Sequence, residues 1–152
     1  MENQKINVEQ MYRGLLMIWL ALVFSQFLFL VIVYIVKPNL FKFDFDQPFL
    51  GTNTIIVLVF IVVAFTNIAI SFFLRKKYAA QAIAEQNVSY VQTAMITGCA
   101  LCEAVSIFGL MLAFVADYQY FFLWSILGIA ATLFHFPRRD DLIAATYKKF
   151  QQ

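Results

Sequence analysis

The chain has 152 residues, of which 62% are hydrophobic and only 13% are charged, and its mean hydropathy is +0.78. These values lie far outside the range of soluble folds and predict an all-α integral membrane protein. The net charge of +2 gives no reason to expect a nucleic acid as partner. The length suits one domain, and we expect residues 1–152 to form it.

Four runs with few or no charges predict four transmembrane helices, because a helix needs about 20 apolar residues to cross a bilayer. Their bounds are 14–36, 51–74, 91–116 and 118–136. The first run is too long and too deep in the chain for a removable signal peptide, so we expect a retained helix. Lys37 and Pro38 should end it. Asp117 alone separates the last two runs, which predicts a tight turn.

The connecting segments have distinct compositions. The stretch from Arg75 to Tyr90 contains no Pro or Gly, so the second and third helices should continue beyond the membrane surface. The tail begins at Pro137 and has apolar residues near one side, which predicts a short interfacial helix. In the first outer loop, phenylalanines alternate with charged residues over 41–46. This alternation predicts an extended segment at the headgroup level or, alternatively, a strand that docks a partner.

The basic residues are distributed unequally between the two sides of the predicted bundle. Only two lie on the side of the outer loops, Lys37 and Lys42. Nine lie on the side shared by both termini and the middle loop: Lys5, Arg13, Arg75, Lys76, Lys77, Arg138, Arg139, Lys148 and Lys149. Because basic residues near helix ends favour the cytoplasmic side, we expect both termini in the cytoplasm, with a bacterial plasma (inner) membrane as the location.

Glu103 is the only ionisable residue in the core of any predicted span. It lies about 18 Å along its helix from the inner boundary, near the middle of a hydrocarbon core about 30 Å thick. Gln26 and Ser125 fall at nearly the same depth, which predicts a polar layer across three helices. Thr66 and Asn67 lie slightly nearer the cytoplasm and would extend this layer inward.

Small residues recur at spacings of three or four along the third predicted helix. They are Gly98, Cys102, Ser106, Gly109 and Ala113. Such a stripe lets another helix approach closely. Glu103 adjoins the stripe, so we expect it at a helix contact and not in open lipid.

Two interpretations of Glu103 remain open. As an ion carrier, the carboxyl group would alternate between neutral and ionised states as its surroundings change. As a structural group, a protonated Glu103 would form a hydrogen bond with Gln26 and fix the register of the bundle.

The segment ALCEAVSIFGLMLAFV, residues 100–115, resembles the carboxylate helix of the proteolipid (c-subunit) family of rotary ATPases. In that family, Ala-Leu-x-Glu-Ala, an aliphatic residue, an aromatic residue and Gly-Leu surround the ion-carrying acid. The resemblance implies that Glu103 carries the ion and that Gln26 is its polar partner, and Ala104 would favour protons over sodium. It covers sixteen residues; the helix before it is bulky and free of glycine, unlike that of the family.

The remaining reactive side chains give little sign of an enzyme acting alone. Cys99 and Cys102 form a C-x-x-C pair, which raises the alternative of a membrane thiol-quinone oxidoreductase, but no loop cysteine accompanies them and we expect them to be packing residues. His135 is the only histidine, and we expect it at the interface beside lipid phosphate. Neither a metal site nor a cofactor site is predicted.

The sequence therefore predicts a four-helix membrane protein that works as a subunit of a larger membrane complex, with Glu103 as a proton-exchanging carboxylate. A purely structural accessory subunit is the alternative. The expected partners are the lipid bilayer and either other membrane subunits or further copies of the chain.

Overall fold

The computed structural model describes residues 8–42, 48–50 and 54–146. The described chain is helical and contains no strand. Its elements are α1 (Val8–Val36), the short 3-10 helix η1 (Pro38–Phe41), α2 (Thr54–Glu85), α3 (Ser89–Ala116), α4 (Phe121–Phe134) and α5 (Arg139–Thr146). Within these ranges, α1, α2 and α3 are long and apolar enough to cross a membrane, and α4 and α5 pass the same test together although they are bent by 42°.

The first helix ends where the sequence predicted. Val36 is its last residue, and Pro38 opens η1. The Lys37 ammonium donates to the carbonyl oxygens of Ala113 and Phe114, each at 3.1 Å, and forms an ion pair with Asp117. These carbonyls lie in the last turn of α3, where they have no partner within the helix. Lys37 thus ties the end of α1 to the end of α3.

The helix α4 is shorter than the predicted span 118–136. It has 14 residues, a length of about 21 Å at 1.5 Å per residue. Asp117 adopts the left-handed conformation, with φ of 46°, and ends α3. Tyr118 accepts a hydrogen bond from the amide of Phe121 at 3.3 Å, so residues 118–120 form the turn and do not join the helix. The tight turn was correctly predicted, but its three residues were wrongly assigned to the span.

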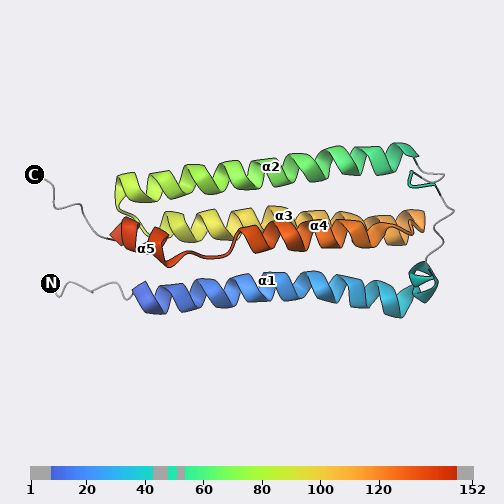
Figure 1. Cartoon of the computed structure of the whole chain (residues 1–152), viewed down its shortest axis with the longest axis horizontal. Coiled ribbons are helices and arrows are strands. Elements are labelled where there is room, and N and C mark those ends of the chain that lie inside the picture. Colours follow the sequence, from blue (N-terminus) through green and yellow to red (C-terminus); the bar gives the residue numbers. More distant parts are fainter. Residues whose placement is uncertain (1–7, 43–47, 51–53, 147–152) are drawn as a thin grey trace, which may run out of the picture.

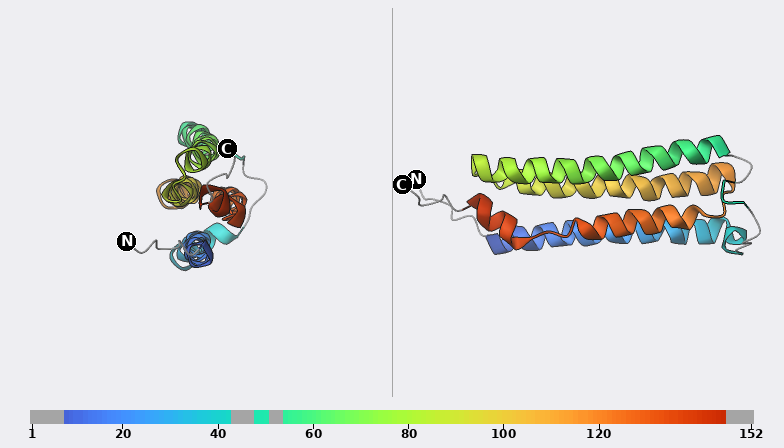
Figure 2. Two further views of the ribbon diagram at one scale, coloured as in Figure 1. Left: turned by 90° about the vertical axis from the view of Figure 1, so that its left-hand side faces the viewer. Right: turned by 45° about the horizontal axis from the view of Figure 1, so that its top comes forward.

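Figures 1 and 2 show that α3 and α4 occupy the middle of the molecule, with α1 and α2 on opposite sides of them. The contacts of α2 follow a narrow stripe, since three of its four buried residues, Val57, Ala64 and Ser71, are spaced by seven and the fourth, Ala82, follows eleven residues later. By contrast, α3 buries eleven residues and is the helix that the others share. Most of the surface of α1 and α2 is therefore apolar and exposed, as expected for helices that face lipid.

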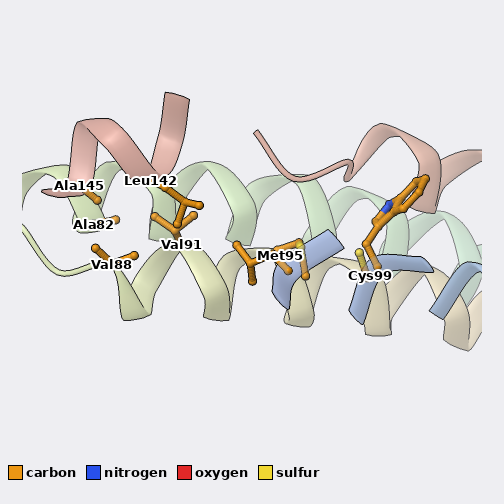
Figure 3. Close-up of a cluster of buried hydrophobic side chains, with 9 residues drawn as sticks. Ala82, Val88, Val91, Met95, Cys99, Leu142 and Ala145 are labelled. Carbon is orange, nitrogen blue, oxygen red and sulfur yellow. The ribbon is translucent and has the colours of Figure 1, made fainter. Parts of the chain in front are cut away.

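Two hydrophobic clusters hold the bundle together. One lies toward η1 and the α3–α4 turn and includes Leu112, Phe121 and Trp124. The other lies at the opposite end, where Figure 3 shows Leu142 and Ala145 of α5 beside Val91 of α3 and Val88, the residue before that helix. The tail helix α5 is thus fastened to the bundle by buried contacts.

Several predicted features lie wholly or partly outside the described residues. They are the alternating segment 41–46, of which 43–46 are not described, the start of the second span at 51–53, and the ends of the chain at 1–7 and 147–152.

Candidate functional site

Glu103 lies halfway along α3, about 21 Å from the start of the helix. It is half-buried. Its carboxylate oxygen Oε1 lies within hydrogen-bonding distance of the hydroxyl of Ser25 on α1. Among the described residues, none of the ion pairs involves Glu103. The site is therefore one carboxyl group and one hydroxyl at the edge of the α1–α3 contact.

Ser25 has two possible acceptors and only one hydrogen to donate. Its Oγ is 2.8 Å from the carbonyl oxygen of Leu22 and also adjoins Glu103 Oε1. When Glu103 is ionised, the Ser25 hydroxyl donates to the carboxylate. When Glu103 is protonated, its own O–H can donate to Ser25, whose hydroxyl then donates to Leu22. The contact suits either protonation state, because rotation of the Ser25 hydroxyl adapts the hydrogen bond when Glu103 gains or loses a proton.

Gln26 does not pair with Glu103, contrary to our expectation. It is completely buried and joins three helices instead. Its Nε2 donates to Thr132 Oγ1 of α4 at 2.8 Å, and its Oε1 accepts from Ser106 of α3 at 2.7 Å. The physical reason is rotation: successive helical residues point about 100° apart, so Ser25 reaches Glu103 at the edge of α3, whereas Gln26 points into the interior between α3 and α4.

This buried network has further members on α4. Thr132 Oγ1 also contacts the carbonyl oxygen of Gly128 at 2.9 Å, and Trp19 donates from its ring nitrogen to the carbonyl oxygen of Thr132 at 3.0 Å. Each polar side chain of the network thus has a partner, which removes the cost of burying it. We call Trp19, Gln26, Ser106 and Thr132 the glutamine network.

The other expected polar partners do not meet Glu103. Ser125 is buried on α4. Thr66 is exposed on α2 and donates back to the carbonyl oxygen of Val62 at 2.8 Å. Asn67 is half-buried on α2, which lies across α3 from α1 (Figure 1). Counting residues along a helix gives the depth of a side chain but not the side of the helix from which it points. The polar layer predicted from depth therefore contained residues that point in different directions.

Ser25 and Thr132 were not among the residues predicted from the sequence. Ser25 could have been predicted, since it and Gln26 are the polar residues near the middle of a span that is otherwise almost wholly apolar. Thr132 lies seven residues after Ser125 and therefore on nearly the same side of α4.

The five small residues of α3 are all buried, and several of them contact α4. A β-carbon on Gly109 would lie 2.6 Å from the Trp124 β-carbon and 2.7 Å from the Phe121 carbonyl oxygen. On the facing helix, a β-carbon on Gly128 would lie 2.9 Å from the carbonyl oxygen of Cys102. Helices α3 and α4 therefore approach so closely that only glycine fits at these points.

His135 is not at the interface, and that expectation was wrong. It is fully buried, and its ring packs against Gly98 and lies 4.7 Å from the ring of Phe72. The absent side chain of Gly98 leaves the space that the imidazole fills. Sequence alone placed His135 correctly at the end of the helix but could not show that a glycine on α3 lay opposite.

The two thiols are buried and are not joined in a disulfide. Cys99 belongs to the hydrophobic cluster of Figure 3, and Cys102 Sγ lies 3.5 Å from the hydroxyl of Ser71. Across the described ranges, no group of three or more His, Cys, Asp or Glu side chains could hold a metal ion.

The comparisons with known proteins do not assign the chain. No family model matches it, and neither does a curated protein or a solved structure.

Proposed function

We propose that the chain is a subunit of a membrane complex and that Glu103, with Ser25, exchanges protons at the α1–α3 face. The observation that carries this proposal is the half-buried carboxyl group halfway along α3, next to a hydroxyl that suits both of its protonation states. A charged carboxylate facing lipid is costly, so the group must be neutral there or covered when ionised. A neighbouring subunit that covers it would control the release of its proton.

The proposal includes a topology. Helix α4 would form the fourth span together with the residues around it, and α5 would lie at the interface. Both termini would be cytoplasmic in a bacterial plasma membrane, because the basic residues favour that end.

The glutamine network bears on the alternative, a purely structural subunit. Gln26 already links α1 to α3 and α4 through hydrogen bonds in the buried interior. Glu103 is therefore not needed to fix the register of these helices. Its place at the edge of the contact favours a chemical role over the purely structural one.

Infrared spectroscopy of the protein in liposomes tests the proton exchange. The carbonyl band of protonated carboxylic acids should contain a component at acidic pH that decreases as pH rises and is lost in Glu103→Gln, while the components of the other Asp and Glu residues remain. Ser25→Ala should change the frequency of the Glu103 component, because the carboxyl group loses its hydroxyl partner. A matched control is Thr66→Ala, which removes a hydroxyl at similar depth on α2. A band that does not titrate, or one that Glu103→Gln leaves unchanged, would exclude Glu103 as the exchanging group.

Photo-crosslinking tests the proposed neighbour. Ile107 is exposed on α3, four residues from Glu103 and on the same face. A photoreactive residue at position 107 should crosslink a membrane protein in cells, whereas one at the exposed Val59 of α2 should not. Crosslinks to lipid alone from position 107 would contradict a subunit contact at this face.

A further inference from the structure

An apolar groove runs between α2 and α4. Two neighbouring cavities of about 250 and 280 Å³ form it and share Leu127. Apolar side chains line it: Phe49, Ile61, Ala64, Phe65, Ile68, Phe72, Leu123, Trp124, Leu127, Ala130, Ala131 and Phe134. In the end-on view of Figure 2, both helices lie beside α3. The groove is separate from the α1–α3 face that carries Glu103.

Two cations of α2 follow this groove at one end. The lining positions Ile68 and Phe72 are continued at helical spacing by Arg75 and Lys76. Asp141 lies near Arg75 and offsets one of the two charges, so this end keeps a net positive charge.

Arg75 is held in place at this end by the backbone. Its guanidinium donates to the carbonyl oxygens of Phe134 at 2.7 Å and Phe136 at 3.0 Å. An arginine has five N–H donors, so these two bonds leave others for an anion. Just inside it, the rings of Phe72 and Phe134 meet with their centroids 6.5 Å apart, which marks the end of the apolar part.

We propose that this groove binds an anionic phospholipid, with one acyl chain along α2 and α4 and the phosphate beside Arg75 and Lys76. The lining on α2 extends from Ile61 to Phe72, about 17 Å along the helix. One leaflet contributes about 15 Å of the hydrocarbon core, whereas a transmembrane helix would need about 30 Å. On α2 the length of the lining therefore matches an acyl chain, and the positive end matches the headgroup.

Native mass spectrometry of the detergent-purified protein with added lipid tests this inference. Phosphatidylglycerol should remain bound at one molecule per chain, and phosphatidylcholine of the same acyl chains should bind more weakly. Ala130→Phe, which fills the groove, should abolish the retained lipid, whereas Ile126→Phe on the same helix should not, because Ile126 does not line the cavities.

The headgroup contact has its own matched pair of variants. Lys76→Gln should weaken phosphatidylglycerol binding about fivefold, the effect of one basic residue near an anionic headgroup, and Lys77→Gln should have little effect. Equal binding of the two lipids, or lipid retained in Ala130→Phe, would overturn the proposal. So would a dimer whose copies are joined by crosslinking between cysteines at position 65, since a second copy would then fill the groove.

Discussion

Gly128 shows how one missing side chain permits the buried polar interior. Its α-carbon faces Ser106, the carbonyl oxygen of Cys102 and Gln26 Oε1, all within contact distance of the position that a β-carbon would take. The amide of Gln26 can reach Ser106 and Thr132 together because α4 lies this close. The hydrogen bonds of Gln26 thus require that residue 128 has no β-carbon.

We expect Gly128→Ala to destabilise the protein by about 2 kcal/mol, because overpacking at this point separates α3 and α4 and stretches the hydrogen bonds of Gln26. Gly14→Ala is the control, since a β-carbon there meets nothing within 4 Å and alanine favours the helix. Unfolding in mixed detergent micelles, followed by circular dichroism, measures both variants. Equal stability of the two would show that the close approach at Gly128 does not support the network.

At this scale the sequence predicted the depth of polar residues but not their direction. Glu103 lies near the middle of α3, and Gln26 lies about two thirds of the way along α1. Their partners are Ser25, Ser106 and Thr132, and choosing them requires the rotation of each helix about its axis. An apolar sequence on all sides of a helix does not reveal that rotation, because lipid and protein interior are both apolar.

At the scale of elements, the carbonyl oxygens at the end of α4 depend on a residue of another helix for hydrogen bonds. Pro137 follows three residues after Phe134, and the last carbonyls of the helix cannot be satisfied by continuing it. Arg75 of α2 supplies the donors. The predicted span ended at residue 136, two residues beyond the helix, and nothing in the sequence indicated that Arg75 would complete its end.

Arg75→Leu should therefore loosen the end of α4 and the start of α5. We expect a loss of about 1 kcal/mol, at the lower end for hydrogen bonds from a charged group because Arg75 is only half-buried. Hydrogen exchange of the amides in residues 133–142 should become faster. Lys77→Leu, two residues away and exposed, should leave the exchange unchanged. Unchanged exchange in Arg75→Leu would mean that these carbonyls are satisfied without the guanidinium.

At the scale of the whole molecule, the described helix ends and connections lie at two opposite ends of the bundle. The start of α1, the α2–α3 connection and α5 lie at one end, and η1 and the α3–α4 turn lie at the other (Figure 1). Hydropathy correctly predicted an all-helical chain with several long apolar helices, of which the described residues contain three, or four if α4 and α5 together form one span. It did not predict the order of the helices in space, because pairing of apolar helices depends on shape, which composition does not encode.

Single-cysteine labelling in intact cells checks which end is cytoplasmic. Cys99→Ala and Cys102→Ala provide the background, and we expect this pair to be tolerated because both thiols are small and buried. In that background, an impermeant maleimide should label a cysteine at Lys42 and should not label one at Lys77 until the membrane is broken. The reverse pattern would invert the proposed topology.

The separation of α1 from α2 has a consequence for biosynthesis. The partners of Gln26 follow it by 80 and 106 residues in the chain, so neither exists when α1 leaves the ribosome. At 5 to 20 residues per second, roughly 5 to 20 s pass before Thr132 has been made. During that interval the amide of Gln26 lacks the two partners that it has in the folded protein. Until α4 is inserted, α1 therefore depends on other molecules in the membrane to bind the polar side chain of Gln26.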